Sequence, residues 1–414
     1  MGTRLGSAGD TAEDEGVISL PDGPDPYPAY QALRQAGPVH RVEMPDGVPV
    51  WLVTRYRDVR AALANPALSN DPRYATAAFG AGEDAGDGRW RPENLHNMLR
   101  TDPPRHTRLR RLTASAFTAR RVQRLRPRII QVADALLEKM ACVTGPVDLI
   151  AGLAFPLPIT VICELLGIPE QDRDQMREWT GAVLAYRVDE ATVANAARAR
   201  EMIHQYLTDL IAQRRRQPAD DVVSELIAAR DQHGGLTEIE LLSTVSLLLT
   251  AGHETTVNLI GNGMLALLRH PQVLDAVRAD PGLVAPMVEE MLRYDSPIVP
   301  GIMKFVAADT TIAGAPIPKG DIVLLAVGSA NRDPEVFPRP EELIPDRSPN
   351  PHLSFGHGTH FCIGAALARM ETEIALSGLL RRFQDIQLAV PWEQLTWRPS
   401  FIRGLTELPV HLVS

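Results

Sequence analysis

The sequence predicts one large, mainly α-helical domain with small β-sheets, an α+β fold in which helices dominate. Helical patterns follow one another from about residue 106 to 294, punctuated by proline and glycine. Short β patterns occur at 48–54 (VPVWLVT), between 298 and 350, and again near the C-terminus. Because neither an internal repeat nor a linker separates these parts, we expect a single domain over residues 26–414.

The composition is that of a globular protein and argues against nucleic acid and membranes as its partners. The 414 residues are 45% hydrophobic and 22% charged, which is enough apolar material for a sizeable core. The formal net charge of −9 argues against nucleic acid as a partner, since phosphate binding requires a basic face. The first 17 residues lack the apolar stretch of a signal peptide, and no apolar run reaches the ~18 residues of a membrane span. We therefore expect a soluble, cytoplasmic protein without a membrane partner.

Two stretches lack a regular pattern. Residues 1–25 are small, acidic and rich in proline and glycine, so we expect a flexible N-terminal tail. Residues 70–98 also show no periodicity and contain several glycines. An irregular segment of that length inside a compact protein is usually functional, so we expect a lid or a binding loop there.

The longest helical pattern begins at a capping box, Thr237-x-x-Glu240, and continues to His270. About 34 residues at ~1.5 Å each predict a rod of roughly 50 Å. It is apolar on nearly every side and should be central. Its polar middle (AGHETT, 251–256) predicts either a kink with satisfied side chains or a local opening where a ligand or water meets an acid–alcohol pair. Val257 stands where a zinc-protease HExxH helix requires histidine, which excludes that motif.

Only three cysteines are present, which excludes a disulfide scaffold and paired CxxC zinc clusters. Cys142 and Cys163 lie in or at the end of helical patterns, and we expect both in the core. Cys362 differs, because segment 355–364 (FGHGTHFCIG) holds three glycines and precedes a helical pattern. Glycines permit a tight turn whose amides point at the sulfur, and a helix N-terminus adds positive potential. Both features favour a metal-ligating thiolate.

These segments resemble the cytochrome P450 superfamily of heme-thiolate monooxygenases. Segment 355–364 is similar to the family's Phe-x-x-Gly-x-x-x-Cys-x-Gly heme loop, and 251–256 is similar to its oxygen-groove motif. Glu290 and Arg293 fit its Glu-x-x-Arg pair, whose spacing places both charges on one helix face. The resemblance runs from about residue 27 to the C-terminus and is closest to soluble bacterial members that oxidise macrolides and other polyketides. It implies the cytochrome P450 fold, in which one long central helix crosses the heme.

The resemblance implies heme b, iron protoporphyrin IX, as the cofactor and assigns roles around the iron. Cys362 is the implied axial metal ligand, whose sulfur donates electron density to the iron. Thr255 is expected to hold oxygen and Glu254 to relay protons, while Ala251 and Gly252 open the groove beside them. The heme loop adds the cofactor-binding residues Phe355, Gly356, His360 and Gly364.

The heme propionates are anions and require cations or hydrogen-bond donors. The resemblance assigns this role to His106 and Arg110, which share one face of a predicted helix, and to His352. Lys304 stands where relatives commonly have arginine, although only three of the 42 basic residues are lysines. A lysine supplies the charge but lacks the bidentate fork of arginine.

The loop before the heme segment departs from the family pattern. Relatives usually have an arginine there that joins the Glu290–Arg293 pair, and Glu342 stands at that position. Either Arg339 or Arg347 substitutes for it, or the network has only two members.

Nine arginines between Arg105 and Arg128 form either a solvated helix face or a docking patch for an acidic ferredoxin. The heme domain uses the whole length, so no flavin or iron–sulfur domain fits in the chain. Electrons are therefore expected from NAD(P)H through a separate ferredoxin reductase and ferredoxin.

The implied activity is O2-dependent hydroxylation or epoxidation of a lipophilic small molecule. The expected substrate is a macrolide or polyketide of secondary metabolism, and a terpene or steroid would also suit the pocket. One alternative is an oxidase that couples or desaturates its substrate without inserting oxygen. Others are a heme-binding sensor or carrier, and a zinc site at residues 357–362, which lacks a distant fourth ligand. The substrate pocket is expected along 75–98 and 184–188 and at the mostly aliphatic residues Leu247, Leu248, Val299, Ile302, Phe401 and Ile402.

Overall fold

Helices dominate the fold, as the sequence predicts. The computed structural model describes residues 18–75, 92–186, 188–231 and 235–413. Its α-helices are α1 (Tyr27–Ala36), α2 (Tyr56–Leu63), α3 (Pro92–Leu95), α4 (Arg105–Ala114), α5 (Ala119–Ala141), α6 (Pro156–Leu166), α7 (Arg173–Leu184), α8 (Glu190–Arg216), α9 (Val222–Asp231), α10 (Glu238–Ala251), α11 (Glu254–Leu268), α12 (Pro271–Ala279), α13 (Val284–Tyr294), α14 (Val327–Ala330) and α15 (Ala365–Arg382).

The strands form three small sheets. They are β1 (Ile18–Ser19), β2 (Val39–Glu43), β3 (Pro49–Val53), β4 (Leu68–Ser69), β5 (Val147–Asp148), β6 (Ile302–Val306), β7 (Thr310–Ile312), β8 (Ala315–Ile317), β9 (Ile322–Leu325), β10 (Asp385–Leu388) and β11 (Pro409–Val413). The largest sheet has the order β1-β2-β3-β9-β6-β4, and the others pair β10-β11-β5 and β7-β8. The three regions of predicted β structure are confirmed.

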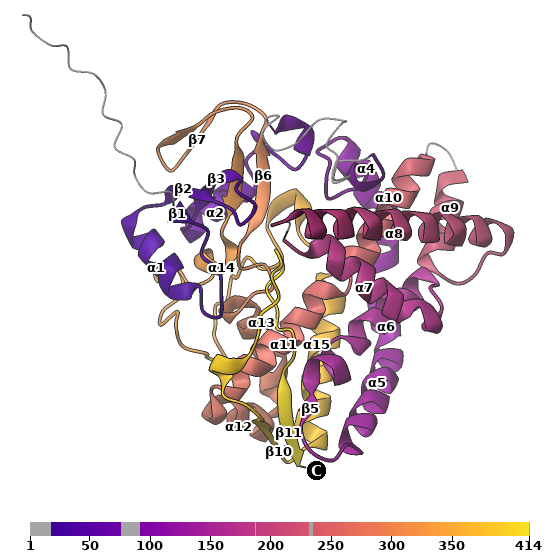
Figure 1. The fold of residues 1–414 in the computed structure, drawn as a ribbon, viewed down its shortest axis with the longest axis vertical. Coiled ribbons are helices and arrows are strands. Elements are labelled where there is room, and N and C mark those ends of the chain that lie inside the picture. The colour runs from indigo at the N-terminus through magenta and orange to yellow at the C-terminus, as the bar shows by residue number, and fades with distance from the viewer. Residues whose placement is uncertain (1–17, 76–91, 187, 232–234, 414) are drawn as a thin grey trace, which may run out of the picture.

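One large hydrophobic core lies among the helices, and two smaller ones lie against the six-stranded sheet. In Figure 1, α11, α13 and α15 lie together near the centre of the view, and these three helices contact one another. The strands of the six-stranded sheet gather at the upper left. There, Leu52 and Leu324 belong to one small core, and their neighbours Val53 and Leu325 belong to the other. This alternation follows from the pleat, which turns successive side chains to opposite faces.

The chain joins the fold before residue 26. Ile18 pairs with Val42 in the parallel β1–β2 ladder, and Leu20 is buried in a core. The Arg403 side chain donates to the carbonyls of Gly23 and Pro24, with both distances 2.7 Å. The predicted C-terminal boundary of the flexible tail is therefore too late in the chain, because residues 18–25 belong to the folded part. Residues 1–17 and 76–91, which include most of the expected loop, lie outside the described residues.

The predicted long central helix is interrupted near its middle. Its start is confirmed, because the side chains of Thr237 and Glu240 each accept a hydrogen bond from the backbone N–H of the other. However, α10 and α11 are separate helices on either side of residues 252–253. The imidazole of His253 donates to the carbonyl of Leu249 (Nδ1–O 2.9 Å), a bond that competes with the backbone amides for this acceptor. The interruption falls within residues 251–256, where the sequence predicts a kink or a local opening, so the helical pattern is confirmed on both sides of it but not as an unbroken rod.

The two cysteines expected in the core differ from each other. Cys163 is fully buried in α6, as expected. Cys142 is exposed, because α5 ends at Ala141 and the cysteine caps that end, so its assignment to the core is wrong. In the part of the chain that the structure describes, no helix has both the length and the apolar composition needed to cross a membrane.

Candidate active site

The loop before α15 folds tightly around Cys362. Gly356 and Gly358 have positive φ angles of 74° and 75°, a conformation that residues with a Cβ rarely adopt. The Cys362 amide donates to the carbonyl of Phe355 (N–O 2.8 Å), which closes the loop. Glycine at these two positions therefore lets the chain reverse direction directly before the helix.

The Cys362 sulfur lies against the N-terminus of α15. Cys362 is accessible to solvent, but desolvation by the protein packed around its thiol is the largest effect on the thiol and raises its pKa. The amides of Gly364 and Ala365 donate hydrogen bonds to the sulfur. These bonds and the charges of Arg110 and Arg369 lower the pKa of the thiol, and so they oppose the effect of desolvation. A metal cation at the sulfur would add to these effects and hold it as a thiolate. The donor set fits a metal bound through one sulfur.

A zinc site does not form at this loop. Among the described residues, no group of three His, Cys, Asp or Glu side chains is close enough together to hold a metal ion. His357, His360 and Cys362 all lie within the described part, so their sequence proximity does not become a ligand set. The zinc alternative is wrong.

Two histidines from distant segments face each other beside the heme loop. The rings of His106 on α4 and His360 have centroids 4.1 Å apart, tilted by 42°. His106 is buried, and neither of its ring nitrogens has a hydrogen-bond partner among the described residues. Burial lowers the pKa of His360 to about 3, with further lowering from His106, Lys304 and Arg110. Neutral rings with unused nitrogens are available to donate to an anion.

Two cations complete this basic cluster, which we define as His106, Arg110, Lys304 and His360. The Arg110 guanidinium donates to the carbonyl of Phe361 (N–O 2.7 Å), and Lys304 donates to the side-chain oxygen of Asn70. Lys304 is buried, and desolvation lowers its pKa to about 8. An open cavity of about 330 Å³ borders the basic cluster and is lined by His106, Thr107, Arg110, Arg111, Ala114 and Thr359.

The basic cluster fits the carboxylates of a heme. It gathers unpartnered ring nitrogens and two cations next to the Cys362 loop, and carboxylates would satisfy these donors. Sequence comparison singled out all four members, but spacing alone did not show that His360 lies against His106.

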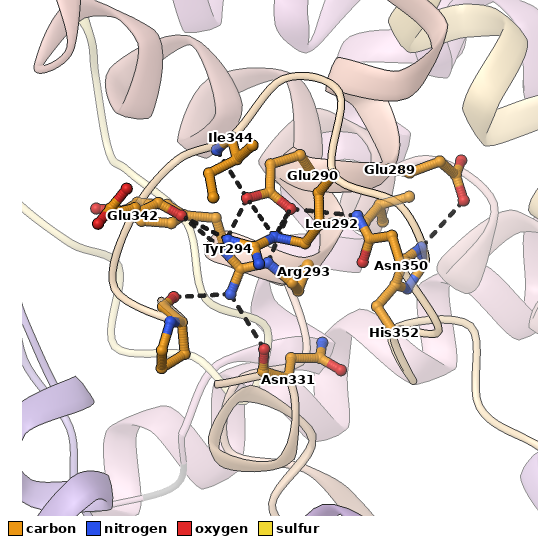
Figure 2. A network of polar contacts seen from close by, with 12 residues as sticks. Glu289, Glu290, Leu292, Arg293, Tyr294, Asn331, Glu342, Ile344, Asn350 and His352 are labelled. Atoms are coloured by element: carbon orange, nitrogen blue, oxygen red, sulfur yellow. Dashed lines mark hydrogen bonds and ion pairs between the residues drawn. The ribbon is translucent and has the colours of Figure 1, made fainter. Parts of the chain in front are cut away.

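His352 lies in a different network. Its Nε2 is 3.1 Å from the Glu289 carboxylate, and its Nδ1 accepts from the amide of Ser354. Burial opposes ionisation of Glu289, but hydrogen bonds from His352 and Arg369 lower its pKa to about 2. Figure 2 shows His352 turned toward Glu289. The structure therefore gives both ring nitrogens of His352 protein partners, and its expected role toward the heme carboxylates stays a prediction.

Arg347 supplies the third member of the buried ion-pair network. Glu290 and Arg293 are fully buried and share two hydrogen bonds of 2.8 Å (Figure 2). The Arg347 Nε lies 3.0 and 3.1 Å from the two Glu290 oxygens. Arg339 instead pairs with Glu342 at the surface. Of the three possibilities left open by the sequence, the structure selects Arg347.

The oxygen-groove motif spans the break between α10 and α11. Ala251 is exposed at the end of α10, and the Thr255 hydroxyl donates to its carbonyl (O–O 3.2 Å). A Cβ at Gly252 would lie 2.3 Å from the carbonyl of Leu248 and 2.8 Å from the side chain of Ile162. Glycine therefore permits close packing of this break against α6. Both sequence readings apply here, because the helix opens and its polar side chains have partners.

Glu254 has a cationic partner that the sequence did not indicate. Its side chain is almost fully buried and forms an ion pair with Arg398. His253 lies beside it, with Nε2 3.7 Å from the carboxylate. Burial lowers the pKa of His253 to about 4, so the ring is neutral and Arg398 provides the positive charge. No short-range motif connects these residues, because Arg398 belongs to a segment near the C-terminus.

The expected pocket residues come from four segments of the chain. Leu248 is buried and Leu247 half-buried on α10, one turn before Ala251. Val299 is buried against Gly328. The remaining members, Ile302, Phe401 and Ile402, are half-buried.

Glu371 on α15 is a buried acid that the sequence did not single out. It is 1% exposed, and neither carboxylate oxygen has a hydrogen-bond partner among the described residues. Desolvation raises its pKa to about 8, so the side chain is neutral at pH 7. The sequence of α15 offered no clear signal, because its buried residues do not follow a simple apolar period.

The family model described as "Cytochrome P450" matches residues 185–281 and 282–395. The chain is 47% identical over 400 residues to the cytochrome P450 monooxygenase PikC of Streptomyces venezuelae, covering 96% of this chain and 93% of that protein. It is 43% identical to the vitamin D(3) 25-hydroxylase of Pseudonocardia autotrophica, covering 93% of both chains. It is 42% identical to the mycinamicin IV hydroxylase/epoxidase of Micromonospora griseorubida, covering 92% and 94%.

A solved cytochrome P450 structure has the same fold as this chain. The crystal structure of the myxobacterial cytochrome P450 CYP267B1 in complex with myristic acid matches with a TM-score of 0.89. The two chains are 41% identical, and the match covers 94% of this chain and 97% of the other. The predicted fold class is confirmed.

Proposed function

Because this chain belongs to the cytochrome P450 family, we propose that it hydroxylates or epoxidises a macrolide or a related polyketide. The chain is a monooxygenase, an oxidoreductase that acts with heme iron and O2 on a small molecule. The observation that carries the proposal is the Cys362 sulfur at the N-terminus of α15, with the basic cluster next to it.

In this proposal, Cys362 holds the heme iron and the basic cluster holds the heme carboxylates. His106 contributes its free ring nitrogens, and Arg110 and Lys304 contribute charge. When bound through a thiolate, heme iron supplies the activation of O2. Gly356 and Gly358 keep the loop in the conformation that presents the sulfur.

Two side chains at the helix break handle protons and oxygen. The Thr255 hydroxyl lies on the accessible side of the break, where Ala251 is also exposed. The Glu254 carboxylate lies one residue away and forms an ion pair with Arg398. We assign proton uptake and release to Glu254 and the hydrogen bond to oxygen to Thr255. The presence of both groups favours oxygen insertion over coupling or desaturation.

The substrate assignment rests on the relatives and on the aliphatic character of the pocket segments. One relative is named for mycinamicin IV and another for vitamin D(3). Among the expected pocket residues, Leu247 and Ile302 are aliphatic and half-buried, and such side chains suit a bulky lipophilic ligand. A polyketide fits this description, and a steroid-like molecule is the competing outcome.

For the electrons, we propose NAD(P)H, a ferredoxin reductase and an acidic ferredoxin, which places the protein in the cytoplasm with its donors. Six of the nine arginines between residues 105 and 128 already contact protein groups. The other three are exposed, and no ion pair holds them within the described part of the chain. They are Arg111, Arg120 and Arg124. Opposite charge at these positions would speed the encounter with a ferredoxin.

The substrate is tested by binding spectra of the purified heme protein. Mycinamicin IV, 6-deoxyerythronolide B and vitamin D3 serve as three probes, because enzymes similar to this chain are named for them. We expect the two macrolide-type compounds to shift the Soret band at lower concentrations than vitamin D3. Preferential binding of vitamin D3 would contradict the polyketide assignment and leave the monooxygenase assignment intact.

A further inference from the structure

We infer that Arg398 is a positioning residue, which holds the Glu254 carboxylate and makes its placement depend on the hairpin of residues 397–405. This inference rests on the proposed proton-handling role of Glu254. It adds Arg398, which lies far along the chain from the oxygen-groove motif, to the residues that determine proton handling. It also gives a structural path through which substrate contacts with the hairpin would affect Glu254.

The contact itself is buried on the Glu254 side. The Arg398 Nη2 touches one Glu254 oxygen and lies 3.3 Å from the side-chain oxygen of Asn258. The Glu254 side chain is 4% exposed, so a charged form needs a partner to offset lost hydration. Arg398 is the cation in contact with it.

The other groups near this carboxylate do not replace Arg398. His253 is adjacent, but burial keeps its ring neutral. Arg177 on α7 is a second cation in this region, and its guanidinium stacks over the ring of Phe155 at 4.1 Å. Its charge acts on His253 and Arg398 from a distance, without an ion pair to Glu254 within the described residues.

The hairpin is fixed against one face of α11. Glu254, Asn258 and Asn262 are four residues apart and form a polar stripe on a helix that is otherwise mostly apolar. Asn262 donates to the carbonyl of Arg403 (N–O 3.2 Å). A Cβ at Gly404 would lie 2.1 Å from the Asn258 side chain, so the hairpin backbone packs directly on this stripe.

The same hairpin is tied to the connection between α7 and α8. The Tyr186 amide donates to the carbonyl of Pro399 (N–O 3.0 Å), and the Ser400 hydroxyl donates to the carbonyl of Leu184 (O–O 2.9 Å). Ala185 and Ser400 also form a β-bridge. A ligand that moves the α7–α8 connection or the hairpin would therefore move Arg398 with it.

The test uses holoenzyme and four proteins: wild type, R398Q, E254Q and the double variant. The infrared band of the protonated carboxyl is recorded against pH, and subtracting the matching E254Q protein isolates Glu254. Because the positive charge of Arg398 favours the ionised acid, we expect R398Q to raise the Glu254 midpoint by about one pH unit or more. R398K should restore most of the wild-type midpoint, and R177Q, which removes a more distant charge, should shift it much less than R398Q does.

A second readout is the fraction of NADPH electrons that ends as hydrogen peroxide, with 6-deoxyerythronolide B as the probe. We expect R398Q to raise this fraction several-fold, and to add nothing further in the E254Q background. An unmoved midpoint in R398Q, or additive effects in the double variant, would overturn the inference. Wild-type peroxide in E254Q itself would instead remove the proposed role of Glu254. The reduced carbon monoxide spectrum checks that each variant is folded and loaded.

Discussion

The rings of His106 and His360 contact each other with centroids 4.1 Å apart, although they come from α4 and from the loop before α15. This contact joins two of the three segments that carry the basic cluster, and Lys304 on β6 supplies the third. It also leaves both ring nitrogens of His106 without a partner in the described part of the chain, in a buried position. Such nitrogens cost stability unless a ligand satisfies them, which is the physical argument for an anion here.

Replacing His106 with alanine is expected to weaken heme retention without unfolding the protein. The variant loses a donor to the heme carboxylates and the ring contact with His360. We expect heme transfer to apomyoglobin to be about 10-fold faster or more, equivalent to the ~1.4 kcal/mol of a charge-assisted hydrogen bond. Gln123→Ala, at an exposed position on α5 outside the cavity lining, is the control. Equal rates in the two variants would argue against the basic cluster as the carboxylate site.

Replacing Cys362 with alanine should abolish the thiolate-type Soret band of the reduced carbon monoxide adduct. The sulfur is the ligand that this band reports, and no other cysteine lies in the loop. Cys142→Ala is the matched control, because Cys142 is exposed at the end of α5. A Cys362→Ala protein that kept the band would refute the assignment of the metal ligand.

Replacing Thr255 with alanine is expected to separate electron use from product formation. The variant lacks the hydroxyl that donates to the Ala251 carbonyl, so no side-chain hydroxyl at this position can hydrogen-bond to oxygen and direct its protonation. We expect NADPH consumption to continue while peroxide replaces product, with product yield falling about 10-fold or more. Thr255→Ser keeps the hydroxyl and should keep the yield. If Thr255→Ala produced as much product per NADPH as wild type, the hydroxyl would have no role in the reaction.

Replacing Arg347 with alanine should destabilise the fold strongly. Glu290 is fully buried, and loss of one cation leaves its charge incompletely compensated beside Arg293. We expect a loss of about 3–5 kcal/mol in the free energy of unfolding. Arg339→Ala breaks only the exposed pair with Glu342, so a change below about 1 kcal/mol is expected. Urea unfolding of both variants measures the difference, and similar losses would exclude Arg347 from the network.

The buried acid Glu371 predicts a decline in stability with rising pH. Its pKa is raised from 4.5 to about 8 in the folded protein, so between these values the folded state holds a proton that the unfolded state has lost. Raising the pH through this window therefore favours unfolding, by up to about 1.4 kcal/mol per pH unit. Glu371→Gln should remove this part of the decline. Glu373→Gln, a partly exposed position on the same helix, should not. Parallel profiles for wild type and Glu371→Gln would contradict the shift.

Features that depend on neighbours along the chain were predictable from the sequence. The glycines of 355–364 dictate a loop that only such residues permit, and the helix after it follows from its own pattern. The capping box at Thr237 and the Glu290–Arg293 pair depend on spacings of three residues within one helix. A short spacing within one helix determines how far apart two side chains lie and whether they share a face. These elements and the fold class were therefore predictable from the sequence.

Partners from distant segments were decided by tertiary packing alone. Arg347 rather than Arg339 contacts Glu290, His360 lies against His106, and Arg398 contacts Glu254. Several arginines and histidines offer the same chemistry, and only the way that helices and loops pack determines which of them arrives within hydrogen-bond distance. The break in the central helix has the same cause. A close approach to α6 at Gly252 and a side-chain bond from His253 outweigh a helical pattern that is continuous in the sequence.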